Sequence, residues 1–199
     1  MWVVKLGGSL SGDPCLTSWL DLLAQLGGGR VTVVCGGGSF ADEVRRVQSC
    51  WQFNDLAAHN MAVLAMAQTA YQCHALNPAL QLATRTTEIR RVLKTGRTAL
   101  WLPFELQRDE PDASTCWSHT SDSIALDLAR RLNAERLVLV KSCRIEPGLS
   151  LAASSEAGVL DRRFAALAEG AAFPIDILHK EDLARLRSLL LGDACHVPA

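Results

Sequence analysis

Short apolar runs alternate with amphipathic segments along the whole chain. Several runs are continuously apolar, which is the pattern of strands that are covered on both faces. These runs predict six strands, at residues 2–6, 30–35, 80–83, 98–102, 136–140 and 174–178. The segments between them predict helices at residues 16–26, 40–50, 55–76, 88–93, 122–132, 164–169 and 181–191. Because strands and helices alternate, we expect right-handed crossovers and an α/β fold in which a mainly parallel sheet lies between helices.

Two stretches break this alternation. Residues 107–119 are polar, contain Pro111 and have no clear period, so they predict a loop between two halves of the chain. Residues 144–159 are rich in glycine, serine and alanine around Pro147, and they predict a second, flexible surface loop. No internal repeat is evident, so we expect residues 1–199 to form a single domain.

Composition narrows the class of protein. Of 199 residues, 49% are apolar and 21% are charged, and the formal net charge is −1. Such a chain can bury a core, which excludes a disordered or collagen-like chain, and it is not a polybasic nucleic-acid arm. The sequence has no apolar run of about 18 residues for a membrane helix, and its first residues do not resemble a signal peptide. We therefore expect a cytoplasmic protein with no nucleic-acid or membrane partner.

The seven cysteines are odd in number and never spaced as Cys-x-x-Cys. This pattern favours buried, reduced thiols over a zinc site or a disulfide framework. The cysteines are at positions 15, 35, 50, 73, 116, 143 and 195.

Nine of the fourteen glycines fall within the first 38 residues. The first cluster, Lys5-Leu6-Gly7-Gly8-Ser9, comes where the first strand ends. Paired glycines allow backbone N–H groups to approach an anion, and the side chains of Lys5 and Ser9 can reach the same anion. The alternative is a tight turn with an exposed lysine, which would add little to stability.

A second cluster, Gly36-Gly37-Gly38, follows an apolar strand and precedes a helix that begins near Ser39. The positive end of a helix dipole and a glycine loop together favour an anionic ligand. The cluster matches neither the dinucleotide fingerprint nor a Walker A motif. Residues 27–29, also glycines, follow a helix and predict its C-cap and a loop.

Two further residues have charged side chains where chemistry is expected. Asp122, in Thr120-Ser121-Asp122-Ser123, opens an amphipathic helix, where it either caps the helix or orients nearby lysines. Lys141 ends a buried strand and is followed by Ser142. Open parallel sheets bind ligands at the carboxyl ends of their strands, so these positions are candidates for one site.

Taken in order, these motifs resemble the amino-acid kinase superfamily, which includes acetylglutamate, carbamate, aspartate, uridylate and isopentenyl phosphate kinases. The resemblance implies a three-layer αβα sandwich, with a phosphoryl acceptor in residues 1–110 and ATP in a shortened nucleotide-binding half, residues 111–199. It also implies roles for individual residues. Lys5 would bridge the donor and acceptor phosphates, and Asp122 would organise the lysines. The phosphates of ATP would bind Gly7, Gly8, Ser9 and Ser142, and the acceptor would bind Gly36, Gly37 and Gly38. Mg²⁺ would arrive with the nucleotide, so we expect no metal site built by the protein.

One departure concerns the late Gly-Gly-Met-x-x-Lys segment of many family members, whose lysine touches the transferred phosphate. Here Gly158-Val159-Leu160-Asp161 stands near that region and has no lysine. We expect Lys141 to take its place as a catalytic residue. An inactive nucleotide-binding or storage subunit of the same fold is the alternative.

Residues 36–45, 58–68 and 120–125 resemble a compact subgroup that contains the aminomethylfuran-methyl phosphate kinases of methanofuran biosynthesis and relatives in C1-metabolising bacteria. The resemblance implies ATP-dependent transfer of the γ-phosphoryl group to a phosphomonoester. The alternative hypothesis is a kinase of the same fold whose acceptor is a carboxylate or an amino acid. Arg45 and His59 would contact the acceptor. Taken without the resemblance, Arg45 is typical of a solvated charge and His59 of a packed histidine.

A stripe of residues at helical spacing predicts a surface in the core or at a subunit interface, and we expect a homodimer or larger homo-oligomer. The stripe comprises Met61, Leu64, Ala65 and Gln68.

Overall fold

The computed structural model describes residues 1–146 and 148–192. In this part of the chain six strands form one parallel sheet in the order β3-β4-β2-β1-β5-β6. The strands are β1 (Trp2–Leu6), β2 (Val31–Cys35), β3 (Gln81–Ala83), β4 (Ala99–Trp101), β5 (Arg136–Lys141) and β6 (Ile175–His179). Each predicted strand is confirmed to within one residue at either end.

Helices cover both faces of the sheet. They are α1 (Cys15–Leu26), α2 (Gly38–Trp51), α3 (Asp55–Leu76), α4 (Thr86–Lys94), α5 (Ser121–Leu132), α6 (Leu151–Glu156), α7 (Phe164–Ala168) and α8 (Leu183–Leu191), with 3₁₀ turns η1 (Gly8–Gly12) and η2 (Phe104–Leu106). Side chains alternate along β1, so Val4 and Leu6 pack with α1, α8 and part of α3, whereas Val3 packs with α4, α5 and α7. The architecture is therefore the expected three-layer αβα sandwich.

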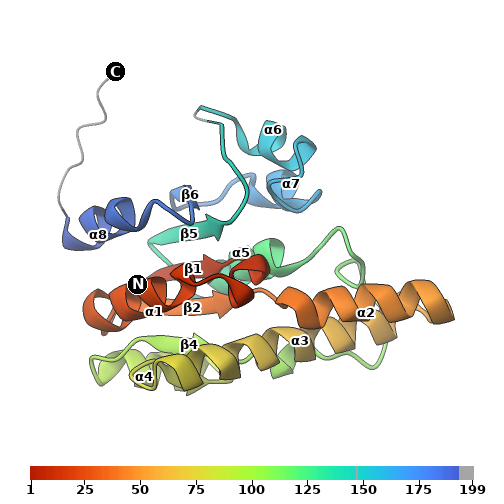
Figure 1. Ribbon diagram of the computed structural model, residues 1–199, viewed down its shortest axis with the longest axis horizontal. Helices are drawn as coiled ribbons and strands as arrows, with labels where there is room; N and C mark the ends of the chain where they lie inside the picture. Colours follow the sequence, from red (N-terminus) through yellow and green to blue (C-terminus); the bar gives the residue numbers. More distant parts are fainter. Residues whose placement is uncertain (147, 193–199) are drawn as a thin grey trace.

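Helices α2 and α3 lie side by side and extend beyond the sheet (Figure 1). The C-cap of α2 is Gln52, whose left-handed φ of 51° turns the chain. α3 then begins with Asn54, whose side chain accepts a hydrogen bond of 2.9 Å from the backbone of Ala57. This antiparallel pair forms one wall of the site described below.

The two stretches predicted as loops behave differently. Residues 107–119 contain turns and bends but no helix or strand, as expected. Within residues 144–159, however, the prediction of a loop is wrong where α6 forms. Ser150 caps this helix, because its Oγ accepts a hydrogen bond of 3.1 Å from the backbone of Ala153. Pro147 lies outside the described residues.

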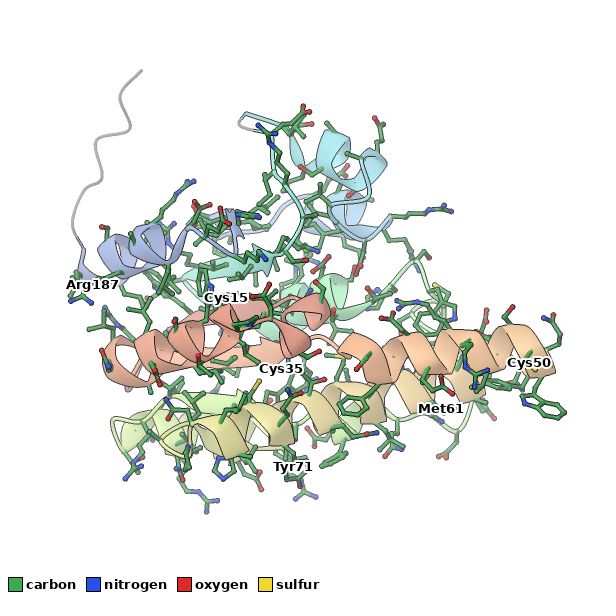
Figure 2. All side chains as sticks on the ribbon, in the orientation of Figure 1. Cys15, Cys35, Cys50, Met61, Tyr71 and Arg187 are labelled. Carbon is green, nitrogen blue, oxygen red and sulfur yellow. The ribbon has the colours of Figure 1, made fainter. Side chains whose placement is uncertain are left out.

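The prediction of buried thiols is only partly right. Cys35 and Cys73 are buried, with their sulfur atoms 3.6 Å apart and unbridged. Cys50 and Cys143 are exposed, which corrects the expectation; Cys50 lies near the tip of α2 (Figure 2). Cys195 lies outside the described residues.

The end of α1 and the lengths of the helices also bear on the sequence predictions. Gly27 is the C-cap of α1, as predicted, and its N–H donates to the carbonyl of Leu23. Among the described helices, none has the length and apolar character needed to cross a membrane.

Candidate active site

Strands β1 and β5 are neighbours, but the chain continues from β1 to β2 on one side and from β5 to β6 on the other. In open α/β sheets, ligands bind at the carboxyl ends of strands at such a switch point. Lys5 pairs in register with Leu139, two residues before Lys141. Because side chains alternate, Lys5 lies on the same face as Val3, and Lys141 lies on the same face as Leu139. That face packs against α5, so both lysines approach its first turn.

Asp122, in this first turn, lies between the two lysines. Lys5 Nζ is 2.7 Å from Asp122 Oδ1, and Lys141 Nζ is 2.5 Å from Asp122 Oδ2. Lys5 and Asp122 are only 3% and 2% exposed. The carboxylate therefore does not cap α5, and of the two readings of Asp122 the structure favours contact with the lysines. Two cations around one anion leave this buried cluster with a surplus positive charge.

The surplus charge is reflected in the acid–base properties of the cluster. Burial acts to raise the pKa of Asp122, but the charges of Lys5 and Lys141 outweigh it and hold that pKa below its ordinary value. Burial and the charge of Lys5 lower the pKa of Lys141, and attraction to Asp122 offsets this only in part. Positive charge held in a poorly solvated site is suited to stabilising negative charge on a phosphoryl group.

Asp161 supplies the cap that Asp122 does not. Its carboxylate accepts hydrogen bonds from the backbone N–H of Thr120 at 2.9 Å and of Ser123 at 3.0 Å, and from the Thr120 hydroxyl. Asp161 thereby ties residues that follow α6 to the turn that carries Asp122. In the sequence, Asp161 is distinguished only by lying in the segment that lacks the family's lysine, and nothing local indicates that its side chain reaches α5.

The two glycine loops pack directly against each other. A Cβ atom on Gly36 would lie 2.4 Å from the nitrogen of Gly8, and one on Gly8 would lie 2.4 Å from the nitrogen of Gly38. The N–H of Gly7 donates to Val140 at 2.9 Å, and that of Gly36 donates to Leu6 at 2.9 Å. These two N–H groups are thus already used within the sheet and are not free for a phosphate in this arrangement.

Other N–H groups of these loops remain free. Within the described part of the chain, no hydrogen-bond acceptor is found for the backbone N–H groups of residues 8–9 and 37–40. We call these N–H groups the amide cradle. They include the first turn of α2, which adds the positive end of a helix dipole. Beside the cradle, the hydroxyl oxygens of Ser9 and Ser142 are 2.6 Å apart, so the loops after β1 and β5 meet here.

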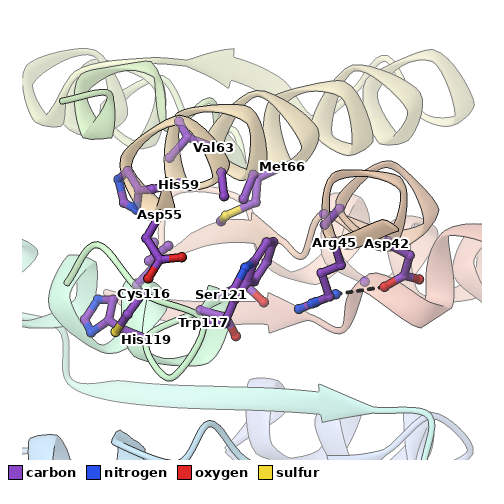
Figure 3. Close-up of a pocket in the computed structure, with 18 of the residues that line it drawn as sticks. Asp42, Arg45, Asp55, His59, Val63, Met66, Cys116, Trp117, His119 and Ser121 are labelled. Atoms are coloured by element: carbon purple, nitrogen blue, oxygen red, sulfur yellow. Dashed lines mark hydrogen bonds and ion pairs between the residues drawn. The ribbon is translucent and has the colours of Figure 1, made fainter. Parts of the chain in front are cut away.

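A cavity of about 230 Å³ extends from the amide cradle along α2 and α3 (Figure 3). Its walls include Gly8, Ser9, Gly37 and Gly38 together with Arg45 and His59. The structure therefore gathers the predicted acceptor residues Gly37, Gly38, Arg45 and His59 around one space. Gly7 and Gly36 are not among the described residues that line it.

Arg45 and His59 both have partners within the protein. Arg45 forms an ion pair of 2.8 Å with Asp42, and its guanidinium lies 4.3 Å from the centre of the Trp117 ring. His59 Nε2 lies 2.9 Å from the carbonyl oxygen of Leu106. Trp117 comes from the loop 107–119, and nothing local in the sequence indicates that this loop folds over α2 and α3.

Among the described residues, the carboxylate nearest the two lysines does not fit a magnesium ion. The described residues contain no group of three or more His, Cys, Asp or Glu side chains that could hold a metal ion. Asp122, the carboxylate nearest the lysines, has an ammonium group on each oxygen. A carboxylate engaged in this way is a poor ligand for Mg²⁺, which prefers free oxygen donors. We therefore assign no step to a protein-bound metal.

Comparisons with known proteins identify relatives of this chain. The model of the amino acid kinase family matches residues 1–143. The [5-(aminomethyl)furan-3-yl]methyl phosphate kinase of Methanocaldococcus jannaschii is 25% identical over 141 residues, which make up 70% of this chain and 64% of that protein. The match thus spans somewhat less than two thirds of the relative's length.

Solved structures show the same fold. Uridylate kinase from Archaeoglobus fulgidus has a TM-score of 0.70 at 17% identity, with 97% of this chain and 96% of that chain covered. Isopentenyl phosphate kinase has a TM-score of 0.59 at 14% identity, with 97% of each chain covered. With the family model matching most of its length, the chain belongs to the amino acid kinase family.

Proposed function

We propose that this protein is a phosphotransferase that moves the γ-phosphoryl group of ATP to the phosphate of a small phosphomonoester. The acceptor in this proposal is [5-(aminomethyl)furan-3-yl]methyl phosphate or a close analogue, since a kinase of that compound is a relative. The observation that carries the proposal is the buried carboxylate of Asp122 between Lys5 and Lys141, beside the amide cradle.

A phosphate acceptor suits the groups that are present. The second pKa of a phosphomonoester is about 6, so its oxygen is already deprotonated at neutral pH and needs no general base. The cluster offers none, because Asp122 is held by two ammonium groups. In the proposed step an acceptor oxygen forms a bond to the γ-phosphorus while the bond to the β–γ bridging oxygen breaks. The products are ADP and a diphosphate.

The chain's own residues would supply position and charge, which are the main requirements of phosphoryl transfer. Lys5 and Lys141 would face the transferred group, with Asp122 holding their ammonium groups apart. The N–H groups of residues 8–9, with the Ser9 and Ser142 hydroxyls, would bind the phosphates of ATP. Those of residues 37–40, with Arg45 and His59, would bind the acceptor. Mg²⁺ would be bound by the nucleotide itself.

We also propose that two copies of the chain associate through the outer face of α3. Met61, Leu64 and Tyr71 are 38%, 40% and 50% exposed, and Met61 and Tyr71 point outward along this helix (Figure 2). Ala65 of the predicted stripe is buried in the core instead. A row of exposed apolar side chains on one helix suits burial against a second copy.

We also propose a cytoplasmic location, because the described cysteines are all unbridged.

The test is an assay of the intact chain with MgATP and [5-(aminomethyl)furan-3-yl]methyl phosphate. We expect ADP release together with a diphosphate product detected by ³¹P NMR, and loss of both in Lys5→Met. A hydroxamate trap identifies acyl phosphate if carboxylates are phosphorylated instead. Binding of ATP without turnover of either acceptor class would overturn the proposal in favour of an inactive nucleotide-binding subunit.

A further inference from the structure

The charged side chains that line the cavity are unevenly paired. Arg45 and Asp42 form an ion pair of 2.8 Å, so their charges offset each other. Asp55 adds a second carboxylate, and its Oδ1 accepts a hydrogen bond of 2.8 Å from the neutral side-chain amide of Gln48. Within residues 1–146 and 148–192, no Lys, Arg or His nitrogen lies within 4 Å of the Asp55 carboxylate. The cavity therefore contains one carboxylate without a cationic partner.

The two histidines of the cavity do not supply that cation. His59 Nε2 lies 2.9 Å from the carbonyl oxygen of Leu106. His119 Nε2 lies 3.2 Å from Asp127 Oδ2. Asp55 lies between His59 and the loop that carries Trp117 (Figure 3). It thus faces the space where a ligand would lie.

The cavity has opposite chemistry at its two ends. Gly38 opens α2 at the amide cradle, and Gln48, which holds Asp55, is ten residues further along the same helix. At a rise of 1.5 Å per residue these positions are about 15 Å apart. A ligand that contacts both ends therefore needs an anionic group at one end and a cationic group at the other, as on a ring that has a phosphate-bearing arm and an aminomethyl arm.

The wall between these ends suits an aromatic ring. Trp117 Nε1 donates a hydrogen bond of 2.6 Å to Gln48 Oε1, and Arg45 lies 4.3 Å from the centre of its ring. The indole is thereby fixed on two sides while it lines the cavity. Val63 and Met66 of α3 add an apolar surface. A flat apolar ring can pack between these side chains.

We propose that Asp55 makes the cavity selective for acceptors that carry a primary ammonium group at the end remote from the phosphate. This inference rests on the proposed function, because it places the acceptor phosphate at the amide cradle. Asp55 also lies in the first turn of α3, where a carboxylate stabilises the helix. That role predicts a change in stability but no change in preference between acceptors, so selectivity distinguishes the two roles.

The experiment compares 4-(aminomethyl)benzyl phosphate with 4-methylbenzyl phosphate, which has the same shape without the charge. kcat/KM for each acceptor and Kd for each, by calorimetry, are measured with the wild-type chain and with Asp55→Asn. Asparagine retains an oxygen that can accept from Gln48. The control is Glu43→Gln, a charge removed from α2 at a residue that pairs with Arg46 outside the cavity.

We expect the wild-type chain to favour the amine about tenfold in kcat/KM and in Kd. Asp55→Asn should lose this preference by weakening only the amine, and Glu43→Gln should retain it. Equal losses for both acceptors, or an unchanged preference in Asp55→Asn, would overturn the inference. The proposed function is tested separately, by turnover of [5-(aminomethyl)furan-3-yl]methyl phosphate, whereas the ratio of the two Kd values tests Asp55 whether or not the benzyl phosphates are phosphorylated. If the wild-type chain binds both benzyl phosphates equally, or binds neither, the inference is rejected.

Discussion

A Cβ atom on Gly36 would lie 2.4 Å from the backbone nitrogen of Gly8. The loops that follow β1 and β2 can therefore approach each other only where neither residue has a side chain. Their approach brings the free N–H groups of the amide cradle together. Gly8 and Gly36 are therefore needed for the contact between the two loops. They affect a ligand only indirectly, because that contact positions the N–H groups of the amide cradle.

Gly36→Ala should both destabilise the protein and reduce its activity. The added methyl group would overlap backbone atoms of Gly8, so the loops must separate, at a cost of about 1–3 kcal/mol. Gly12→Ala is the matched control, because a Cβ there meets nothing within 4 Å. Urea denaturation and kcat/KM check the prediction. Equal stability of the two variants would mean that the loops are not in close contact.

Much of the fold could be predicted because the strands are predominantly apolar and several are continuously so. Each of the six runs had clear ends, so the strand boundaries needed no tertiary information. α6 was missed because it has only six residues in a segment rich in glycine and serine. Its cap at Ser150 and its packing against α7 stabilise it, and neither is visible as an apolar period.

The site could be predicted where it lies at the ends of strands. Lys5 and Lys141 each follow a buried run, and Asp122 opens an amphipathic helix, so local sequence is enough to predict these three as candidates, and the structure brings their side chains into contact. The positions of Trp117 and Asp161 could not be predicted in this way. Gln48, the partner of Trp117, is 69 residues away along the chain, and Thr120, a partner of Asp161, is 41 residues away. Contacts of that kind depend on how loops cross the sheet, which local patterns do not encode.

Lys5→Met and Asp122→Asn should differ in stability although both should lose activity by orders of magnitude. Of the two alternatives for Lys5, the exposed lysine of a tight turn is wrong, because Lys5 is 3% exposed. Removing Lys5 leaves Asp122 and Lys141, whose charges cancel, so we expect the free energy of unfolding to change by no more than about 1 kcal/mol. Removing the Asp122 charge leaves two buried ammonium groups unpaired, at a cost of about 3–5 kcal/mol.

Urea denaturation of both variants checks this order, with Asp109→Asn in the exposed loop as the control. A loss of stability in Lys5→Met as large as in Asp122→Asn would contradict the charge balance drawn for the cluster.

Asp161→Ala should destabilise the protein by about 1–2 kcal/mol, because the first turn of α5 loses its cap. The same turn carries Asp122, so kcat should fall as well. Asp161→Asn retains one accepting oxygen and should be intermediate in both measurements. Glu156→Ala, at an exposed position of α6, is the control. If stability falls in Asp161→Ala while kcat is unchanged, the cap does not position Asp122.

Activity should decline at alkaline pH as Lys141 loses its proton. Burial and the charge of Lys5 lower the pKa of Lys141 below its ordinary value of 10.5, so kcat/KM should fall at a lower pH than for an ordinary lysine. In Lys141→Arg the guanidinium remains charged, and this decline should disappear even if the maximal rate is reduced. Lys94→Arg, on the surface of α4, should keep the wild-type profile. Identical alkaline limbs in wild type and Lys141→Arg would assign the titration to another group.

The same pKa has a consequence for stability. Between the lowered pKa in the folded chain and the ordinary value in the unfolded chain, the unfolded state binds more protons at Lys141. Stability contributed by this group therefore rises with pH across that interval. Denaturation of wild type and Lys141→Arg at several alkaline pH values should show this rise only in the wild type.

Arg45 and its neighbour Arg46 allow a direct test of the acceptor wall. Each forms an ion pair with a carboxylate three residues earlier on α2, but only Arg45 lines the cavity. Arg45→Met should raise KM for the acceptor about tenfold, with little change in KM for ATP, because the side chain at this position would no longer fix Trp117 in the cavity wall or offer a charge to the acceptor. Arg46→Met should leave both KM values unchanged. Steady-state kinetics with each substrate varied in turn separates these outcomes, and parallel effects of the two substitutions would reduce Arg45 to a solvated surface charge.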